Sequence, residues 1–182
     1  MTAIEFVKFI NETQLSFEFL ESRVNKDYAE SILRRATIPI NANKYIEQGN
    51  EILNLVLNYD LDKFDIFDIG FDKDLDKIGD DIYFGWTGSG ERLGFNKFSK
   101  EVFKYYIYTD EIEQYCAPND ELFLDALFEL HKYQNEVISR NGDEQIEKIQ
   151  EKFLKKMKNF FNDDKYISFY SIVIGYEGED EL

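Results

Sequence analysis

The chain has 182 residues with 43% hydrophobic and 16% aromatic content, which is enough to build one buried core and predicts a single domain. Its 37 acidic and 21 basic side chains give a formal net charge of −16. An acidic surface repels the phosphates of nucleic acids and attracts basic proteins, so the charge argues against direct binding of DNA or RNA.

The sequence shows no signal for a membrane or for export. No stretch reaches the roughly 18 uncharged apolar residues that a membrane span needs, and Met1 to Phe9 lacks the basic and apolar regions of a signal peptide. The single cysteine, Cys116, has no partner for an internal disulfide or a cysteine zinc site, which suits a reducing compartment. We therefore expect a cytoplasmic protein.

The excess of acidic residues is concentrated in two stretches. Residues 60–81 hold nine Asp against three Lys, a net charge of −6, and residues 177–182 hold four acids and no base, a net charge of −4. Together they supply −10 of the total −16. This distribution predicts a contact surface within residues 60–81 and an acidic tail at 177–182, after a single domain that spans residues 1–176.

The first third of the chain predicts helices. Thr2 followed by Glu5 is a capping box, so a helix begins at the N-terminus. A second helical pattern runs from about residue 27 to 36 and ends before Pro39, since a residue that precedes proline avoids the α region. A third pattern, over residues 46–57, has an apolar stripe at helical spacing.

The middle of the chain predicts strands. The hydrophobic pattern changes to that of β-structure at residues 65–71 and again at 82–84. Residues 93–98 and 102–108 flank the short polar link Ser99-Lys100-Glu101, which predicts an antiparallel hairpin. These strands would form a small meander.

Two further helices and a last strand complete the pattern. A helix begins at Asp120 and ends at the stop signal Asn141-Gly142, and residues 146–160 have apolar side chains at helical spacing. Residues 166–174 are rich in β-branched and aromatic side chains and predict a final strand. Together the elements predict an α+β fold in which amphipathic helices pack against a mostly antiparallel sheet.

Three aspartates in the acidic stretch resemble the start of a calcium-binding loop. Asp72, Asp74 and Asp76 reproduce its D-x-D-x-D opening. The rest of the motif is absent, because Lys77 stands where the turn needs glycine and Tyr83 stands where a bidentate glutamate closes the cage. We therefore expect a solvated acidic loop, no metal and no cofactor.

The glycine-rich segment at residues 85–90 predicts a tight turn that needs glycine at positive φ. It lacks the lysine of a P-loop and the spacing of a dinucleotide-binding loop, and a strand follows it, whereas phosphate-binding loops lead into a helix. Trp86 within it is compatible with an exposed contact or with a place in the core. The core is favoured, because buried aromatic residues outnumber exposed ones.

His131 is the only histidine, and it lies beside Leu127 and Leu130 on the flank of an amphipathic helix. A histidine that acts as a base needs partners that position it, and no Ser or Cys nucleophile stands in a recognisable motif. We expect a histidine at the boundary of the core, in a protein that is not an enzyme.

Five short segments occur in a recognisable order. They are Ile69-Gly70, Gly88-Ser89-Gly90-Glu91-Arg92, Leu93-Gly94-Phe95-Asn96, Ser99-Lys100-Glu101-Val102-Phe103 and Leu122-Phe123-Leu124-Asp125-Ala126-Leu127. Through them the chain from Asp65 to about Tyr133 resembles the SUKH superfamily, which includes the Smi1/Knr4 domain. The related part would span about residues 42–140, with an additional helix and strand at 143–175. The N-terminal part lacks the family's usual L-P-x-x-Y-x-x-F signature.

The resemblance implies an α+β fold and, in bacteria, an immunity protein that neutralises a toxin by binding it. Many such toxins are nucleases with basic active-site faces, so an acidic inhibitor could occupy the place of the phosphate backbone. The contact surface is expected at Asp72, Asp74, Asp76, Asp80, Asp81, Trp86 and Glu91.

Two alternatives remain open. One is a regulatory or scaffolding domain that binds an endogenous protein, as eukaryotic members of the resembled family are thought to do. The other is a hydrolase that uses scattered carboxylates with a divalent ion bound near residues 72–76.

Overall fold

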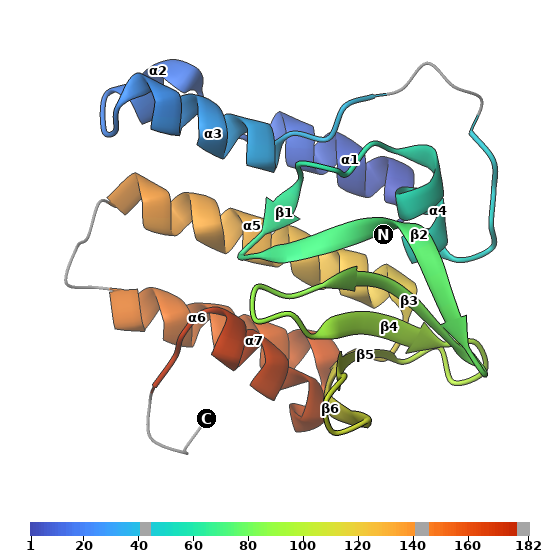
Figure 1. The fold of residues 1–182 in the computed structure, drawn as a ribbon. Coiled ribbons are helices and arrows are strands. Elements are labelled where there is room, and N and C mark those ends of the chain that lie inside the picture. Colours follow the sequence, from blue (N-terminus) through green and yellow to red (C-terminus); the bar gives the residue numbers. More distant parts are fainter. Residues whose placement is uncertain (41–44, 141–145, 178–182) are drawn as a thin grey trace.

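The computed structural model describes residues 1–40, 45–140 and 146–177. Its helices are α1 (Ala3–Glu12), α2 (Phe17–Glu21), α3 (Lys26–Ala36), α4 (Glu51–Asn58), α5 (Asp120–Arg140), α6 (Ile146–Phe161), the short 3-10 helix η1 (Asp164–Tyr166) and α7 (Ile167–Val173). Its strands are β1 (Asp65–Ile66), β2 (Ile69–Ile78), β3 (Asp81–Trp86), β4 (Arg92–Asn96), β5 (Val102–Tyr106) and β6 (Glu111–Ala117). Figure 1 shows their arrangement.

The strands form one antiparallel sheet in the order β1-β2-β3-β4-β5-β6, so each strand pairs with its neighbour in the sequence. This meander, with helices packed around it, confirms the predicted α+β fold and the single domain. In Figure 1, α2 and α3 lie above α5, and α6 and α7 lie below it. No helix among the described residues is long and apolar enough to cross a membrane.

The core is centred on Phe84 of β3. Its ring lies 6.3 Å from Phe71 of β2, 6.3 Å from Phe95 of β4 and 5.7 Å from Phe123 of α5, measured between ring centroids. Each buried aromatic ring removes about 150 to 250 Å² from water, so this cluster contributes much of the stability that joins α5 to the sheet.

Side-chain caps define the starts of the N-terminal helices. The Glu5 amide donates to Thr2 Oγ1 at 3.2 Å and the Thr2 amide donates to the Glu5 carboxylate at 2.9 Å, which confirms the predicted capping box. Asn50 Oδ1 accepts from the Leu53 amide at 3.0 Å, so α4 begins at Glu51 and not at residue 46. Gly49, with φ of +70°, occupies the turn before this cap.

The strand predicted at residues 166–174 is wrong, because this segment forms η1 and α7. Ile167, Tyr170 and Ile174 are buried at helical spacing, and the Tyr170 hydroxyl donates to the Cys116 carbonyl of β6 at 2.9 Å. Contact with the core therefore overrides the β-propensity of the individual residues.

Strand β6 lies in a segment for which the sequence predicted no element. β2 extends to Ile78, so the predicted acidic loop is also wrong: Asp72, Asp74 and Asp76 belong to a strand. The stop signal Asn141-Gly142 and the tail from residue 178 lie outside the described residues.

Candidate functional site

The sheet has two faces with different surroundings. Phe84 points to the inner face, where its ring meets Phe123 of α5. Successive side chains of a strand point to opposite faces, so Tyr83 points to the other one. We call this the outer face and define it by Asp72, Asp76, Asp81, Tyr83, Trp86, Arg92, Phe103 and Tyr105. In Figure 1 the described helices lie behind and beside the sheet, and none covers the outer face.

Aromatic rings form the base of the outer face. Tyr83 contacts Phe103 and Tyr105 edge to face, at centroid distances of 6.0 and 5.4 Å. The Arg92 guanidinium lies 5.3 Å from the centroid of the Tyr83 ring, a cation–π contact. Gly94 allows this packing, since a Cβ there would come within 3.0 to 3.1 Å of the Phe103 and Tyr83 rings. Ring contacts between neighbouring strands thus contribute to the burial of Tyr83 and Phe103 on this face.

Two of the predicted contact residues bind Arg92. Its Nη1 lies 2.5 Å from Asp76 Oδ2 and its Nη2 lies 3.7 Å from Asp72 Oδ2. Burial, together with the charges of Asp76 and Asp74, raises the pKa of Asp72 above its ordinary value, although Arg92 acts in the opposite direction. The carboxylates are therefore crowded together, and one guanidinium partly compensates them.

The other predicted aspartates lie near the same face. Asp81 Oδ1 accepts from Asn96 Nδ2 at 2.7 Å, and Asp80, in the turn between β2 and β3, lies 3.3 Å from Lys97 Nζ. Asp74 is exposed in an irregular part of β2. There Phe71 pairs with Gly85 but Asp76 pairs with Tyr83, so residues 72–75 bulge out of the ladder. This bulge coincides with the sharp bend of β2 in Figure 1.

Metal binding finds no support in this arrangement. Strand β2 does not form the loop that a calcium site needs, and Arg92 takes up Asp72 and Asp76. Within residues 1–40, 45–140 and 146–177, no three His, Cys, Asp or Glu side chains gather into a group that could hold a metal ion.

Trp86 lies on the outer face and is 41% exposed, so the predicted place in the core is wrong. One side of its indole covers Gly70, its cross-strand partner. Tryptophan can lie this close to the backbone only because Gly70 has no Cβ. The predicted tight turn after Trp86 is confirmed: Gly90 has φ of +89°, and its amide donates to the Thr87 carbonyl at 2.8 Å.

Glu91 differs from the other predicted contact residues, because it is buried with 8% exposure. Its carboxylate accepts hydrogen bonds from the hydroxyls of Thr87 and Ser89. Burial alone would raise the pKa of Glu91, but these two donors, together with a backbone hydrogen bond and the charge of Lys104, outweigh burial and the pKa lies below its ordinary value. Glu91 therefore orders the turn after Trp86 from the interior and is not part of the outer face.

Sequence reasoning missed several exposed apolar side chains at the hairpin ends. Phe98 in the β4–β5 turn is 78% exposed, and Tyr108 in the β5–β6 turn is 88% exposed, stacked edge to face on Tyr106. Exposed aromatic residues beside acidic groups are typical of protein contact sites. The run Tyr105-Tyr106-Ile107-Tyr108 could have indicated these exposed side chains, but the sequence analysis assigned all of it to the strand predicted at residues 102–108.

His131 is buried and not at the boundary of the core, which corrects the prediction. Its Nε2 lies 3.1 Å from Asn135 Nδ2. Burial lowers the pKa of His131 to about 4, so the imidazole is neutral at pH 7. Cys116, the single cysteine, is also buried and free, and burial raises its pKa well above the ordinary value. Neither group is available for surface chemistry.

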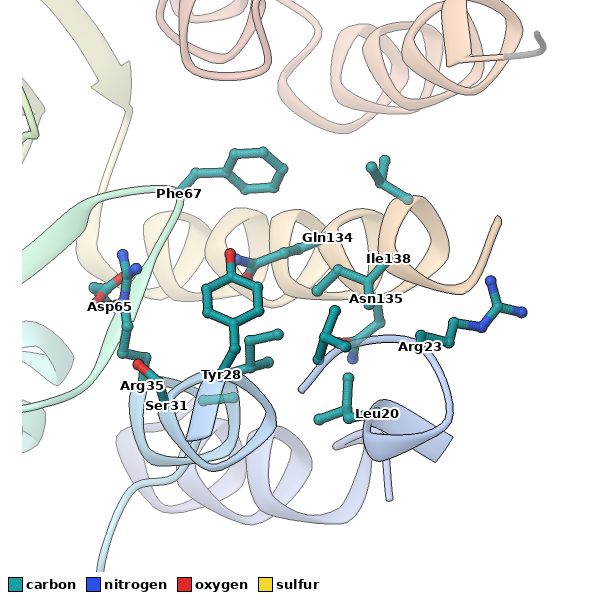
Figure 2. A pocket seen from close by; sticks show the side chains of 14 residues that line it. Leu20, Arg23, Tyr28, Ser31, Arg35, Asp65, Phe67, Gln134, Asn135 and Ile138 are labelled. Atoms are coloured by element: carbon teal, nitrogen blue, oxygen red, sulfur yellow. Dashed lines mark hydrogen bonds and ion pairs between the residues drawn. The ribbon is translucent and has the colours of Figure 1, made fainter. Parts of the chain in front are cut away.

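A cavity of about 400 Å³ lies between the α2–α3 hairpin and α5. Figure 2 shows Leu20, Ile138 and Phe67 pointing toward it, with Tyr28 at one side. Arg35 closes one end, where it binds Asp65 through two hydrogen bonds of 2.6 Å and Asp68 through one of 2.7 Å. Arg35 thereby attaches α3 to β1 and to the turn between β1 and β2.

Comparison of the chain with protein-family models, curated proteins and solved structures finds no match.

Proposed function

We propose that this protein acts by binding a basic protein partner through the outer face of its sheet, and that it is a cytoplasmic immunity protein that neutralises a toxin. The observation that carries the proposal is an exposed tryptophan on a sheet face that also holds the carboxylates of Asp72, Asp76 and Asp81 and that no described helix covers. Tryptophan is enriched among the residues that dominate binding energy, and aligned carboxylates select a cationic partner.

The electrostatics favour fast association with a basic surface. The net charge of −16 creates an attractive field for cations at a distance, and at short range the partner meets the carboxylates of β2 and β3. Arg92 already holds Asp72 and Asp76, so the exposed Asp74 and the partly exposed Asp81 are the groups with the greatest capacity for new contacts.

The resemblance to the SUKH superfamily supports the choice of a toxin as the partner. A nuclease toxin presents a basic face to phosphates, and the outer face offers it carboxylates in place of that backbone. A regulatory domain that binds an endogenous protein would use the same surface, so the identity of the partner separates the two functions.

The test uses the toxin domain encoded beside the gene, with growth rescue on co-expression and calorimetric binding as readouts. We expect rescue and tight binding that weakens with salt. Trp86→Ala is expected to weaken binding about 30-fold, the equivalent of roughly 2 kcal/mol. Asp74→Lys should slow association most at low salt, and Glu151→Lys on the distant helix α6 is the matched charge control.

A wild-type protein that neither binds that toxin nor rescues growth contradicts the immunity function. Equal losses for Asp74→Lys and Glu151→Lys would contradict the outer face as the contact surface, because they would show an effect of total charge only. Purification of an endogenous complex that depends on Trp86, from cells without a neighbouring toxin, would favour the regulatory function.

A further inference from the structure

A second, smaller cavity lies on the inner side of the sheet, away from the outer face. It has a volume of about 240 Å³ and opens between the turn after Trp86, strands β5 and β6, and helix α7. The residues that line it include Thr87, Ser89, Lys104, Gln114, Phe169 and Val173. Polar side chains of the turn and of both strands contribute to this lining.

Lys104 supplies a buried positive charge to this cavity. The residue is only 6% exposed, and its Nζ lies 3.1 Å from a carboxylate oxygen of Glu113, a half-exposed residue. An ammonium group has three N–H donors, and this contact occupies one of them. Burial of an ammonium is costly unless its donors are satisfied, so the remaining N–H groups favour an anionic or carbonyl oxygen in the cavity.

Gln114 is the cross-strand partner of Lys104 and has a hydrogen-bond acceptor that no donor in the described part of the chain reaches. Its Oε1 is buried and receives no hydrogen bond, the one buried side-chain atom in this state among the described residues. Its Nε2 lies 3.4 Å from Ser168 Oγ, a long hydrogen bond. A buried acceptor without a partner is rare in folded proteins and calls for a ligand or water that donates to it.

The turn at residues 87–89 makes the opposite wall rich in acceptors. The hydroxyl hydrogens of Thr87 and Ser89 are directed to the Glu91 carboxylate, so toward any other group these oxygens can only accept. The ionised Glu91 behind them adds a negative charge, which the charge of Lys104 partly compensates. A ligand group in front of this turn must therefore donate, and a cationic donor is favoured.

We propose that this cavity binds a small zwitterion of the α-amino-acid type. The ligand carboxylate would lie on Lys104 Nζ, and its ammonium would donate to Gln114 Oε1 and to the hydroxyl oxygens in front of Glu91. A simple anion leaves Gln114 without a donor, and a simple cation meets the positive charge of Lys104, whereas a ligand that carries both charges satisfies both walls. Phe169 and Val173 of α7 form an apolar side that suits a small aliphatic side chain.

The experiment is calorimetry and thermal unfolding of the full chain with glycine, alanine and valine, each compared with acetate and with methylammonium. We expect saturable binding and a rise in Tm with at least one amino acid and neither with the two single-charge ions. Saturable binding of none of the amino acids at millimolar concentration, or equal binding of acetate, would overturn the proposal.

Substitutions then assign the two walls. Lys104→Met and Gln114→Leu are each expected to weaken binding about tenfold or more, as for lost hydrogen bonds to charged groups. Gln114→Glu retains an acceptor for the ligand ammonium and should restore binding relative to Gln114→Leu. Lys97→Met, which removes an exposed lysine from the opposite end of the sheet hairpins, is the control.

Because Lys104→Met can change the stability of the free protein, the quantity compared is the ligand-induced increment in Tm for each variant, with near-ultraviolet circular dichroism as the test of native packing. Binding that is unchanged in natively packed Lys104→Met and Gln114→Leu would overturn the assignment of the site. These readouts do not involve a protein partner, so they are independent of the proposed immunity function.

Discussion

Gly70→Ala is expected to lower the free energy of unfolding by about 2 kcal/mol through a clash with Trp86, within the range of roughly 1 to 3 kcal/mol for overpacking. A Cβ at Gly70 would lie 2.3 Å from Cζ2 and 2.5 Å from Cε2 of the indole. Atoms cannot approach so closely, so the ring must leave its place over the strand or β2 and β3 must separate. In the absence of the indole ring, alanine at this strand position would raise the free energy of unfolding by roughly 0.5 to 1 kcal/mol relative to glycine.

A double-mutant cycle measures this contact directly. In a Trp86→Ala background, Gly70→Ala is expected to be neutral or stabilising, so the coupling energy should reach about 2 kcal/mol, well above the roughly 0.5 kcal/mol of independent sites. Urea unfolding followed by circular dichroism gives the four free energies. Trp86 is the only tryptophan, so a red shift of its emission in Gly70→Ala reports the displaced ring. A cost of Gly70→Ala that is the same in both backgrounds would show that the contact with Trp86 is not its cause.

Two further predictions concern His131 and Arg35. Burial lowers the pKa of His131 from 6.5 to about 4, so between these values the unfolded state binds a proton that the native state does not. The free energy of unfolding should therefore fall as pH falls through this window, by up to about 3 kcal/mol, and urea titrations should show a smaller fall in His131→Gln. Arg35→Met should lower the free energy of unfolding by roughly 1 kcal/mol. It should also speed amide hydrogen exchange in α2 and α3 but not in α6. Exchange rates in α2 and α3 that are the same in the variant and the wild type would contradict the attachment through Asp65.

The sequence predicts the helices with strong caps and periodicity well. Thr2 and Glu5 fix the start of α1, and the long apolar stripe from Asp120 fixes α5, because both signals are local. The hairpin of β4 and β5 is also local, since only the short link around Lys100 joins its strands.

The errors occur where distant contacts decide the structure. Residues 167–173 have the composition of a strand but form α7, since that conformation directs Phe169 and Tyr170 into the core. β6 has a polar first half, Glu111 to Glu113, and becomes a strand only through pairing with β5. Pairing of this kind cannot be seen in the segment itself.

The candidate site shows the same limit. Sequence reasoning placed Asp72, Asp76, Asp81 and Trp86 in one region, and the structure brings them to one face. It also placed Glu91 there, but the hydroxyls of the turn draw that carboxylate inward. Adjacency in sequence does not tell which face of a strand a residue occupies once a bulge has shifted the alternation.

The bulged strand β2 also has an unpaired border. β1 pairs only with Ile69 and Gly70, so from Asp72 to Ile78 the backbone of β2 has no neighbour of that sheet on one side, a template on which another chain could align. Aspartates stand at every second position, 72, 74 and 76. If the same strand of a second molecule paired there, the carboxylates of the two copies would repel each other. The carboxylates that we propose attract a basic partner are therefore the same groups that disfavour edge-to-edge pairing of two copies of this protein.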